Sequence, residues 1–107
     1  MNLSEKIREE RTKRKITLEE LAKTVGSSKG YIWQIENGPN IKPSTQLIAN
    51  IAKALNVTVD YLVDSDKKVM DSNDESLVFF RNFKGLSEKS KEILLKQMEA
   101  LKERDEA

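Results

Sequence analysis

TLEELAKTVGSSKGYIWQIENG, residues 17–38, has the pattern of two short helices joined by a tight turn. Thr17 and Glu20 form a capping box at the start of the first helix, because each side chain can satisfy a backbone N–H of the other residue. Gly26 supplies the left-handed conformation that ends a helix at low cost. Ser28 then caps a second helix, which the final glycine of the stretch ends. The apolar residues recur at helical spacing and predict the buried sides: Leu18, Leu21, Ala22, Val25, Ile32 and Ile35.

The outward face of the second helix carries the functional signal. At about 100° per residue, Gly30 and Gln34 lie opposite the two isoleucines, and they are flanked by Lys29, Trp33 and Asn37. This face has hydrogen-bond donors and acceptors but no carboxylate. A helix fits the major groove of DNA, where glutamine can pair with adenine and lysine can donate to guanine. Taken alone, the pattern is equally compatible with an ordinary solvated helix face.

Residues 26–38 resemble the helix-turn-helix of the phage repressor and Cro-like regulators, the XRE family. The similarity continues through PSTQLIANIAKALNVTVDYL, residues 43–62, and covers roughly residues 3–63. It implies an all-α, five-helix, lambda-repressor-like domain that binds duplex DNA through the second helix of the motif. In such a fold, a short helix capped by Thr58 would close the core with Val59 and Leu62.

The resemblance and the outward face together predict which residues contact DNA. Four are expected to read bases: Lys29, Gly30, Trp33 and Gln34. A second group is expected to hold the DNA backbone: Thr17, Ser28, Tyr31, Asn37, Asn40, Lys42 and Ser44, of which the last four stand at positions that the resemblance assigns to this role. Pro39 and Ile41 stand where many relatives have basic residues, so we expect modest non-specific affinity. Three alternatives stay open, in which Gly30 is simply tolerated, Trp33 packs on the neighbouring loop, or Tyr31 covers the core.

The resemblance also implies a structural ion pair between Arg11 and Glu36. Glu36 lies about 40° from Ile32 on the helical wheel, so its charge needs a partner if it is buried. Most other charged residues of the first helix, Lys6 and Glu10 among them, are expected on a solvated face.

Composition narrows the classes of function. The chain has 107 residues, which suits one small domain with an appendage. It contains no cysteine and no histidine, so we expect no enzymatic activity, no metal site and no cofactor. No apolar run approaches the roughly 18 residues of a membrane span, and the N-terminus lacks the apolar core of a signal peptide. We therefore expect a cytoplasmic protein that is not associated with a membrane.

Charge and pattern divide the chain into a DNA-binding domain (residues 1–64), a polar linker (65–74) and a C-terminal helical oligomerisation region (75–107). Residues 1–63 hold ten Lys and Arg against seven Asp and Glu, whereas residues 64–107 hold nine against eleven. A mildly basic front and an acidic rear suit a DNA-facing module with a separate association region.

The rear region has the pattern of two amphipathic helices that together form a dimerisation tail. They are broken at Gly85, and the second is capped by Ser87. Their apolar residues are expected to join two copies of the chain: Leu77, Phe79, Phe80, Phe83, Ile93, Leu94, Met98 and Leu101. Folding back onto the DNA-binding domain is the alternative. A homodimer is favoured because helix-turn-helix proteins usually read paired half-sites.

These observations predict a sequence-specific transcriptional regulator, expected to be a repressor, that binds a palindromic double-stranded DNA operator as a homodimer. The competing hypothesis is a protein-interaction module, such as an antitoxin that neutralises a toxin through its C-terminal helices. A protein antirepressor would be a further partner.

Overall fold

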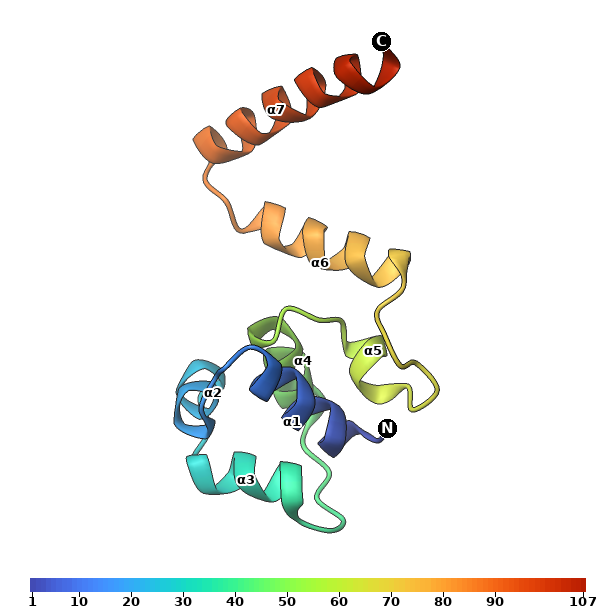
Figure 1. Cartoon of the computed structure of the whole chain (residues 1–107). Coiled ribbons are helices and arrows are strands. Elements are labelled where there is room, and N and C mark those ends of the chain that lie inside the picture. Colours follow the sequence, from blue (N-terminus) through green and yellow to red (C-terminus); the bar gives the residue numbers. More distant parts are fainter.

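The computed structural model describes residues 1–107, which form seven helices and no strand. Their bounds are α1 (Leu3–Lys13), α2 (Leu18–Val25), α3 (Lys29–Asn37), α4 (Thr45–Ala54), α5 (Val59–Val63), α6 (Ser72–Lys84) and α7 (Glu88–Glu106). Figure 1 shows α1 to α5 grouped in one bundle, with α6 and α7 extending from the side opposite α3. The all-α fold predicted from the sequence is confirmed.

Each helix begins after a polar residue whose side chain accepts a hydrogen bond from a backbone N–H of the first turn. These caps are Asn2, Thr17, Ser28, Ser44, Thr58, Asp71 and Ser87. The predicted capping box is present, since the Glu20 carboxylate in turn accepts from the Thr17 N–H at 3.0 Å. Such caps satisfy N–H groups that have no partner within the helix.

Two glycines shape the helix-turn-helix for different reasons. Gly26 has a φ of 70°, in the left-handed region that a side chain disfavours, and it turns the chain from α2 into α3. Gly38 has an ordinary φ of −83°. A Cβ atom at this position would lie 2.7 Å from the Gln34 carbonyl oxygen, so only glycine fits at the end of α3.

The core is enclosed by α1 to α5, and its members come from all five helices and from the turn between α4 and α5. It contains Ile7, Leu21, Ala22, Val25, Ile32, Ile35, Ile51, Ala52, Leu55, Val57, Tyr61 and Leu62. The prediction that Val59 closes the core is wrong, since Val59 is exposed and Tyr61 is buried instead. In a helix as short as α5, Tyr61 and Leu62 point inward together, and Val59 in its first turn faces solvent.

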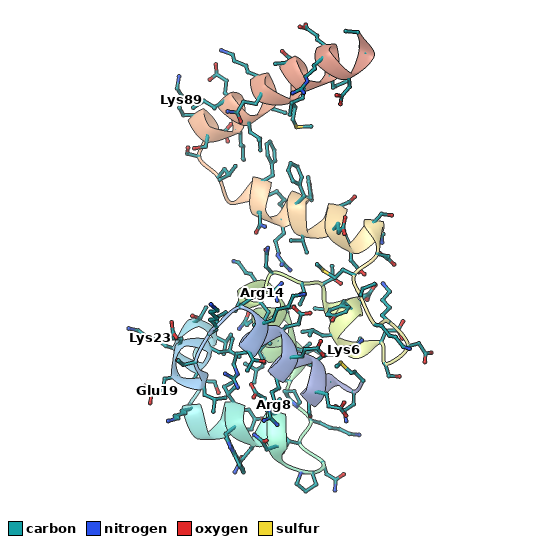
Figure 2. The ribbon with its side chains drawn as sticks, in the orientation of Figure 1. Lys6, Arg8, Arg14, Glu19, Lys23 and Lys89 are labelled. Carbon is teal, nitrogen blue, oxygen red and sulfur yellow. The ribbon has the colours of Figure 1, made fainter.

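Two charged residues of α1 are buried, against the prediction of a solvated face. The Lys6 ammonium donates to the backbone oxygens of Tyr61, at 2.6 Å, and of Asp64, and it lies between α1 and α5 (Figure 2). The Glu10 carboxylate accepts a hydrogen bond of 2.9 Å from the Tyr61 hydroxyl. Burial, with this hydrogen bond, raises the pKa of Tyr61 to about 12. The two Lys6 bonds satisfy carbonyls at the end of α5 that have no partner within the helix, and together with the bond between Tyr61 and Glu10 they tie α5 to α1.

The segment after α5 differs from the predicted linker. Because α6 begins at Ser72, the last three of residues 65–74 are helical, and Asp74 is buried. Val78 is the one buried apolar residue of α6, and α7 has no buried residue. The tail therefore makes a narrow contact with the bundle and does not fold back along it. None of the seven helices combines the length and the low charge that a bilayer crossing requires.

Candidate nucleic-acid interface

The outward side of α3 is free of the protein's own chain. The four predicted base-reading residues are all exposed, and Trp33 keeps 53% of its surface accessible. Ile32 and Ile35 point inward and are buried, so the helix presents one polar and one apolar side. α3 lies at the edge of the bundle, far from the tail (Figure 1). This geometry leaves a helix-wide surface that could enter a major groove.

The structure bears on two of the three alternatives left open for α3, those that concern Gly30 and Tyr31. A Cβ atom on Gly30 would meet no atom within 4 Å, so packing within the protein does not require glycine there. Tyr31 is half-buried and packs against the core, which gives it a structural role whether or not its hydroxyl reaches phosphate.

Six of the seven residues predicted to hold the DNA backbone are exposed, and Tyr31 is the half-buried one. Three of the six are the caps of α2, α3 and α4. Their hydroxyl oxygens accept backbone N–H groups at 3.0–3.1 Å: Thr17, Ser28 and Ser44. Each hydroxyl hydrogen is still available to donate, and each sits at the positive end of a helix. Such groups suit phosphate contact.

The end of α3 and the loop after it carry the remaining backbone candidates. Asn37 Nδ2 donates to the Trp33 carbonyl oxygen at 3.0 Å, which closes the last turn of α3. Asn40 has a φ of 59°, a left-handed conformation that asparagine tolerates better than most residues. Lys42 is exposed and forms no ion pair. It is the one basic side chain between α3 and α4.

The position of α3 is fixed by a paired arginine and glutamate. Arg11 Nε lies 2.7 Å from Glu36 Oε2, and Nη2 lies 2.9 Å from Oε1. The Glu36 side chain is 1% exposed, so its charge is compensated inside the protein. The hydrogen bond to Glu36 raises the pKa of Arg11 above its ordinary value. The structure thus brings together the two residues that the resemblance pairs.

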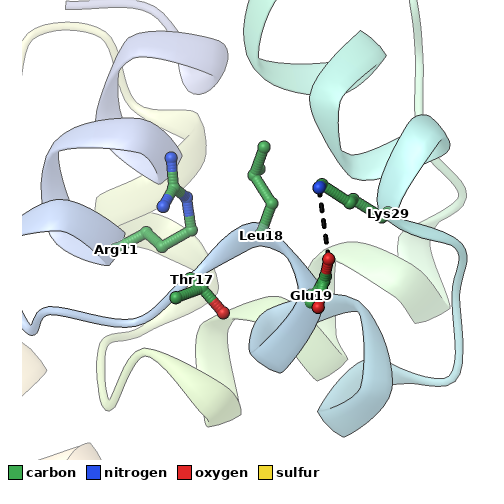
Figure 3. A pocket seen from close by; sticks show the side chains of 5 residues that line it. All are labelled: Arg11, Thr17, Leu18, Glu19 and Lys29. Atoms are coloured by element: carbon green, nitrogen blue, oxygen red, sulfur yellow. Dashed lines mark hydrogen bonds and ion pairs between the residues drawn. The ribbon is translucent and has the colours of Figure 1, made fainter.

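One residue at this surface is missed by the sequence pattern. Glu19 Oε1 lies 3.2 Å from Lys29 Nζ, and both side chains are exposed. The pair borders a pocket of about 450 Å³ whose other lining residues are Arg11, Thr17 and Leu18 (Figure 3). The caps at Thr17 and Ser28 place Glu19 and Lys29 in the first turns of successive helices. The sequence therefore contained a signal that could have pointed to this pair. Lys29 must exchange this carboxylate for DNA if it is to contact a base.

Comparison with known proteins agrees with this geometry. Residues 7–62 match the helix-turn-helix family, and the matched segment spans most of α1 to α5. The chain is a helix-turn-helix transcriptional regulator. It belongs to the Cro/C1-type, or XRE, branch of DNA-binding regulators, which are not enzymes.

Known relatives of this regulator resemble it over two different lengths. The HTH-type transcriptional regulator SinR of Bacillus subtilis is 29% identical over 92 residues, 81% of this chain and 83% of SinR. A solved complex of SinR and SinI has a TM-score of 0.57 at 29% identity, and covers 94% of this chain and 98% of that one. The P22 c2 repressor, solved with a synthetic operator, has a TM-score of 0.57 at 35% identity, and covers 62% and 98%.

The two lengths correspond to the two parts of the fold. The P22 c2 match accounts for a lambda-repressor-like DNA-binding domain, whereas the longer SinR match extends over the C-terminal helices as well. The regulator is therefore all-α, with a repressor-type domain followed by helices arranged as in SinR.

Proposed function

We propose that this regulator represses transcription by binding a palindromic operator as a homodimer. The observation that carries the proposal is the uncovered outward side of α3, on a helix held rigidly from behind by Arg11 and Glu36. Lys29, Gly30, Trp33 and Gln34 would read bases there. The P22 c2 repressor, solved with a synthetic operator, supports this use of the shared domain.

In this proposal residues 1–64 are the DNA-binding unit, and the tail is the association region. Residues 64–71 connect them without regular helix. We expect the protein to act in the cytoplasm, where an operator is accessible.

The tail supports association because it leaves large apolar side chains in solvent. Phe80 is 58% exposed, and the stacked rings of Phe79 and Phe83 lie 6.3 Å apart. Of the eight predicted dimerisation residues, six are exposed and two, Phe83 and Leu94, are half-buried. Soluble monomers rarely expose so many apolar residues on adjoining helices. A second copy would cover them and would place two α3 helices on two half-sites.

A protein antagonist is the second candidate partner for the same tail. The structure of SinR was solved together with SinI, and that match extends over the tail helices of this regulator. A partner that bound these apolar residues would compete with dimerisation and would weaken operator binding. The antitoxin hypothesis uses the same tail but requires no DNA.

Selection of duplexes from a random pool by the full chain tests the proposal. We expect an inverted repeat whose half-sites lie about 10 base pairs apart, centre to centre. Phe80→Asp should lower dimerisation in sedimentation velocity and weaken binding to the repeat, whereas Ser65→Asp adds the same charge to an exposed site outside the tail helices and should change neither. Absence of any enriched sequence, with stoichiometric capture of a protein, would favour the interaction module instead.

A further inference from the structure

A buried polar junction joins the DNA-binding domain to the tail. Asp74, in the first turn of α6, is 1% exposed. Its Oδ1 accepts a hydrogen bond of 2.7 Å from the Thr58 hydroxyl. Its Oδ2 accepts from Lys67 Nζ and from the Asp71 N–H, each at 3.0 Å. Each carboxylate oxygen of Asp74 is therefore bonded, and the donors are the cap of α5, the connection and the cap of α6.

Thr58 is the residue that links the two parts of the molecule through this junction. Its hydroxyl oxygen caps α5 by accepting the Tyr61 N–H at 3.0 Å, while its hydrogen goes to Asp74. Burial alone would raise the pKa of Asp74, but the hydrogen bonds from Thr58, Asp71 and Lys67 outweigh it and lower the pKa to about 2. The junction is therefore charged and complete at neutral pH.

Further contacts hold the same face of α6. Arg81 Nη1 donates to the Val57 carbonyl oxygen at 3.0 Å, and Asn82 Nδ2 donates to Asn56 Oδ1 at 3.0 Å. Together with Asp74 and the buried Val78, these residues follow the i, i+4, i+7, i+8 pattern of one helix face. Because only one apolar residue of α6 is buried, directional hydrogen bonds rather than apolar area set the angle of this helix.

We propose that Asp74 is a positioning residue for operator recognition, which sets the angle between α3 and the tail and thereby selects the spacing of the half-sites. The inference rests on the proposed homodimer. When two tails are joined, the junction in each copy fixes how far α3 lies from the two-fold axis and how it is rotated. Moving a half-site by two base pairs shifts it by about 7 Å and rotates it by about 70°. A rigid junction cannot follow that change, whereas a loose one can.

Asp74→Asn is the variant that tests this role with the least change of shape. An amide removes the negative charge and one of the two acceptor oxygens. Turned one way it leaves Lys67 and the Asp71 N–H without an acceptor, and turned the other way it leaves the Thr58 hydroxyl hydrogen without one, so part of the junction is lost in either orientation. Asp66→Asn is the matched control, because Asp66 is an exposed acid of the same connection and its carboxylate forms no ion pair. Thr58→Ser keeps the bridging hydroxyl and should behave as the parent.

The first measurement is binding to synthetic duplexes that carry the selected half-site twice, at spacings varied by single base pairs. We expect the parent, Asp66→Asn and Thr58→Ser to prefer one spacing by about tenfold or more over spacings two base pairs away. Asp74→Asn should fall to within about threefold, with unchanged binding to a duplex that carries a single half-site. Retention of the parental preference by Asp74→Asn, with or without weaker overall binding, would overturn the proposal.

The second measurement needs no DNA and separates failure of this inference from failure of the proposed function. The chain has no cysteine, so Lys23→Cys and Ser76→Cys give a specific pair of spin labels on α2 and α6, both at exposed sites. With labelled chain diluted in unlabelled chain, we expect a narrow distance distribution in the parent and a broad one after Asp74→Asn. Equal widths would overturn the junction's role even if DNA binds, while a parent that selects no DNA overturns the proposed function and the spacing claim together.

Discussion

The guanidinium of Arg11 meets the carboxylate of Glu36 through two parallel hydrogen bonds, of 2.7 and 2.9 Å. The remaining terminal nitrogen, Nη1, donates to the Ile16 carbonyl oxygen at 2.8 Å. One side chain therefore joins α1, the connection into α2 and the end of α3. A bidentate geometry of this kind fixes orientation as well as distance.

Loss of Arg11 should destabilise the whole domain. Arg11→Ala leaves the Glu36 carboxylate buried without a partner, so we expect the free energy of unfolding to fall by about 3–5 kcal/mol in urea denaturation. Arg11→Lys should recover only part of the loss, because an ammonium cannot form the paired bonds. Arg8→Ala, at an exposed site of the same helix, should stay within about 0.5 kcal/mol of the parent. If Arg11→Ala and the parent unfold at the same urea concentration, the pair contributes nothing to the stability of the domain.

The elements that could be predicted are those set by neighbouring residues. The capping box of Thr17 and Glu20, the left-handed turn at Gly26 and the apolar spacing of α2 and α3 all act within a few residues. Those signals gave the helix-turn-helix and, through it, the exposed side of α3. Gly38 was identified as a helix end, but the close approach to the Gln34 carbonyl that requires glycine there depends on the folded loop.

The features that could not be predicted depend on partners far along the chain. Lys6 meets a carbonyl 55 residues away, and Asp74 meets a hydroxyl 16 residues away. Lys6 and Glu10 share a side of α1 with Ile7, and this spacing alone would place them in the core. Charged residues are seldom buried, however, so a solvated face was predicted for both. Hydrogen-bond partners from distant parts of the chain allow these charged groups to be buried, and a single sequence does not show such partners.

Two side chains of the interface should affect DNA binding in different ways. Gln34→Ala is expected to cost about 1–3 kcal/mol at one base position and to relax the preference there. Lys42→Ala should weaken binding to every sequence and reduce the slope of log affinity against log salt by about one unit. Fluorescence anisotropy titrations at several salt concentrations, with the selected duplex and its single-base variants, measure both. Equal and sequence-independent losses for the two variants would contradict the assignment.

Removal of the carboxylate beside Lys29 should strengthen DNA binding. Glu19 neutralises Lys29 in the free protein and repels nearby phosphates, so Glu19→Gln is expected to raise affinity about three- to tenfold at low salt for all sequences. The control is Glu9→Gln, which removes an exposed charge from α1 and should raise affinity less. Glu20→Gln is unsuitable as a control because Glu20 belongs to the capping box. Weaker binding of Glu19→Gln at one base position would instead assign Glu19 to cytosine recognition.

Substitution of Gly30 should separate stability from recognition. Gly30→Ala meets no atom of the protein, and alanine favours a helix by up to about 1 kcal/mol over glycine, so the melting temperature should rise. If the bare backbone lets α3 approach the DNA closely, the same variant should bind the selected duplex at least about tenfold more weakly, a loss of about 1.4 kcal/mol. An unchanged dissociation constant would mean that glycine is merely tolerated at this position.

Acid should weaken the junction that joins the tail to the DNA-binding domain. The pKa of Asp74 is lowered from 3.8 to about 2 by its hydrogen bonds, which outweigh burial, so the unfolded chain binds the proton more readily than the folded one. The stabilisation from Asp74 is therefore fully present above pH 4 and is lost as the pH falls from about 4 to 2. Urea denaturation at pH 5, 4, 3 and 2 should show the gap between the parent and Asp74→Asn narrowing steadily. Asp66→Asn should show no such narrowing, and a gap for Asp74→Asn that is independent of pH would assign the effect to shape rather than to charge.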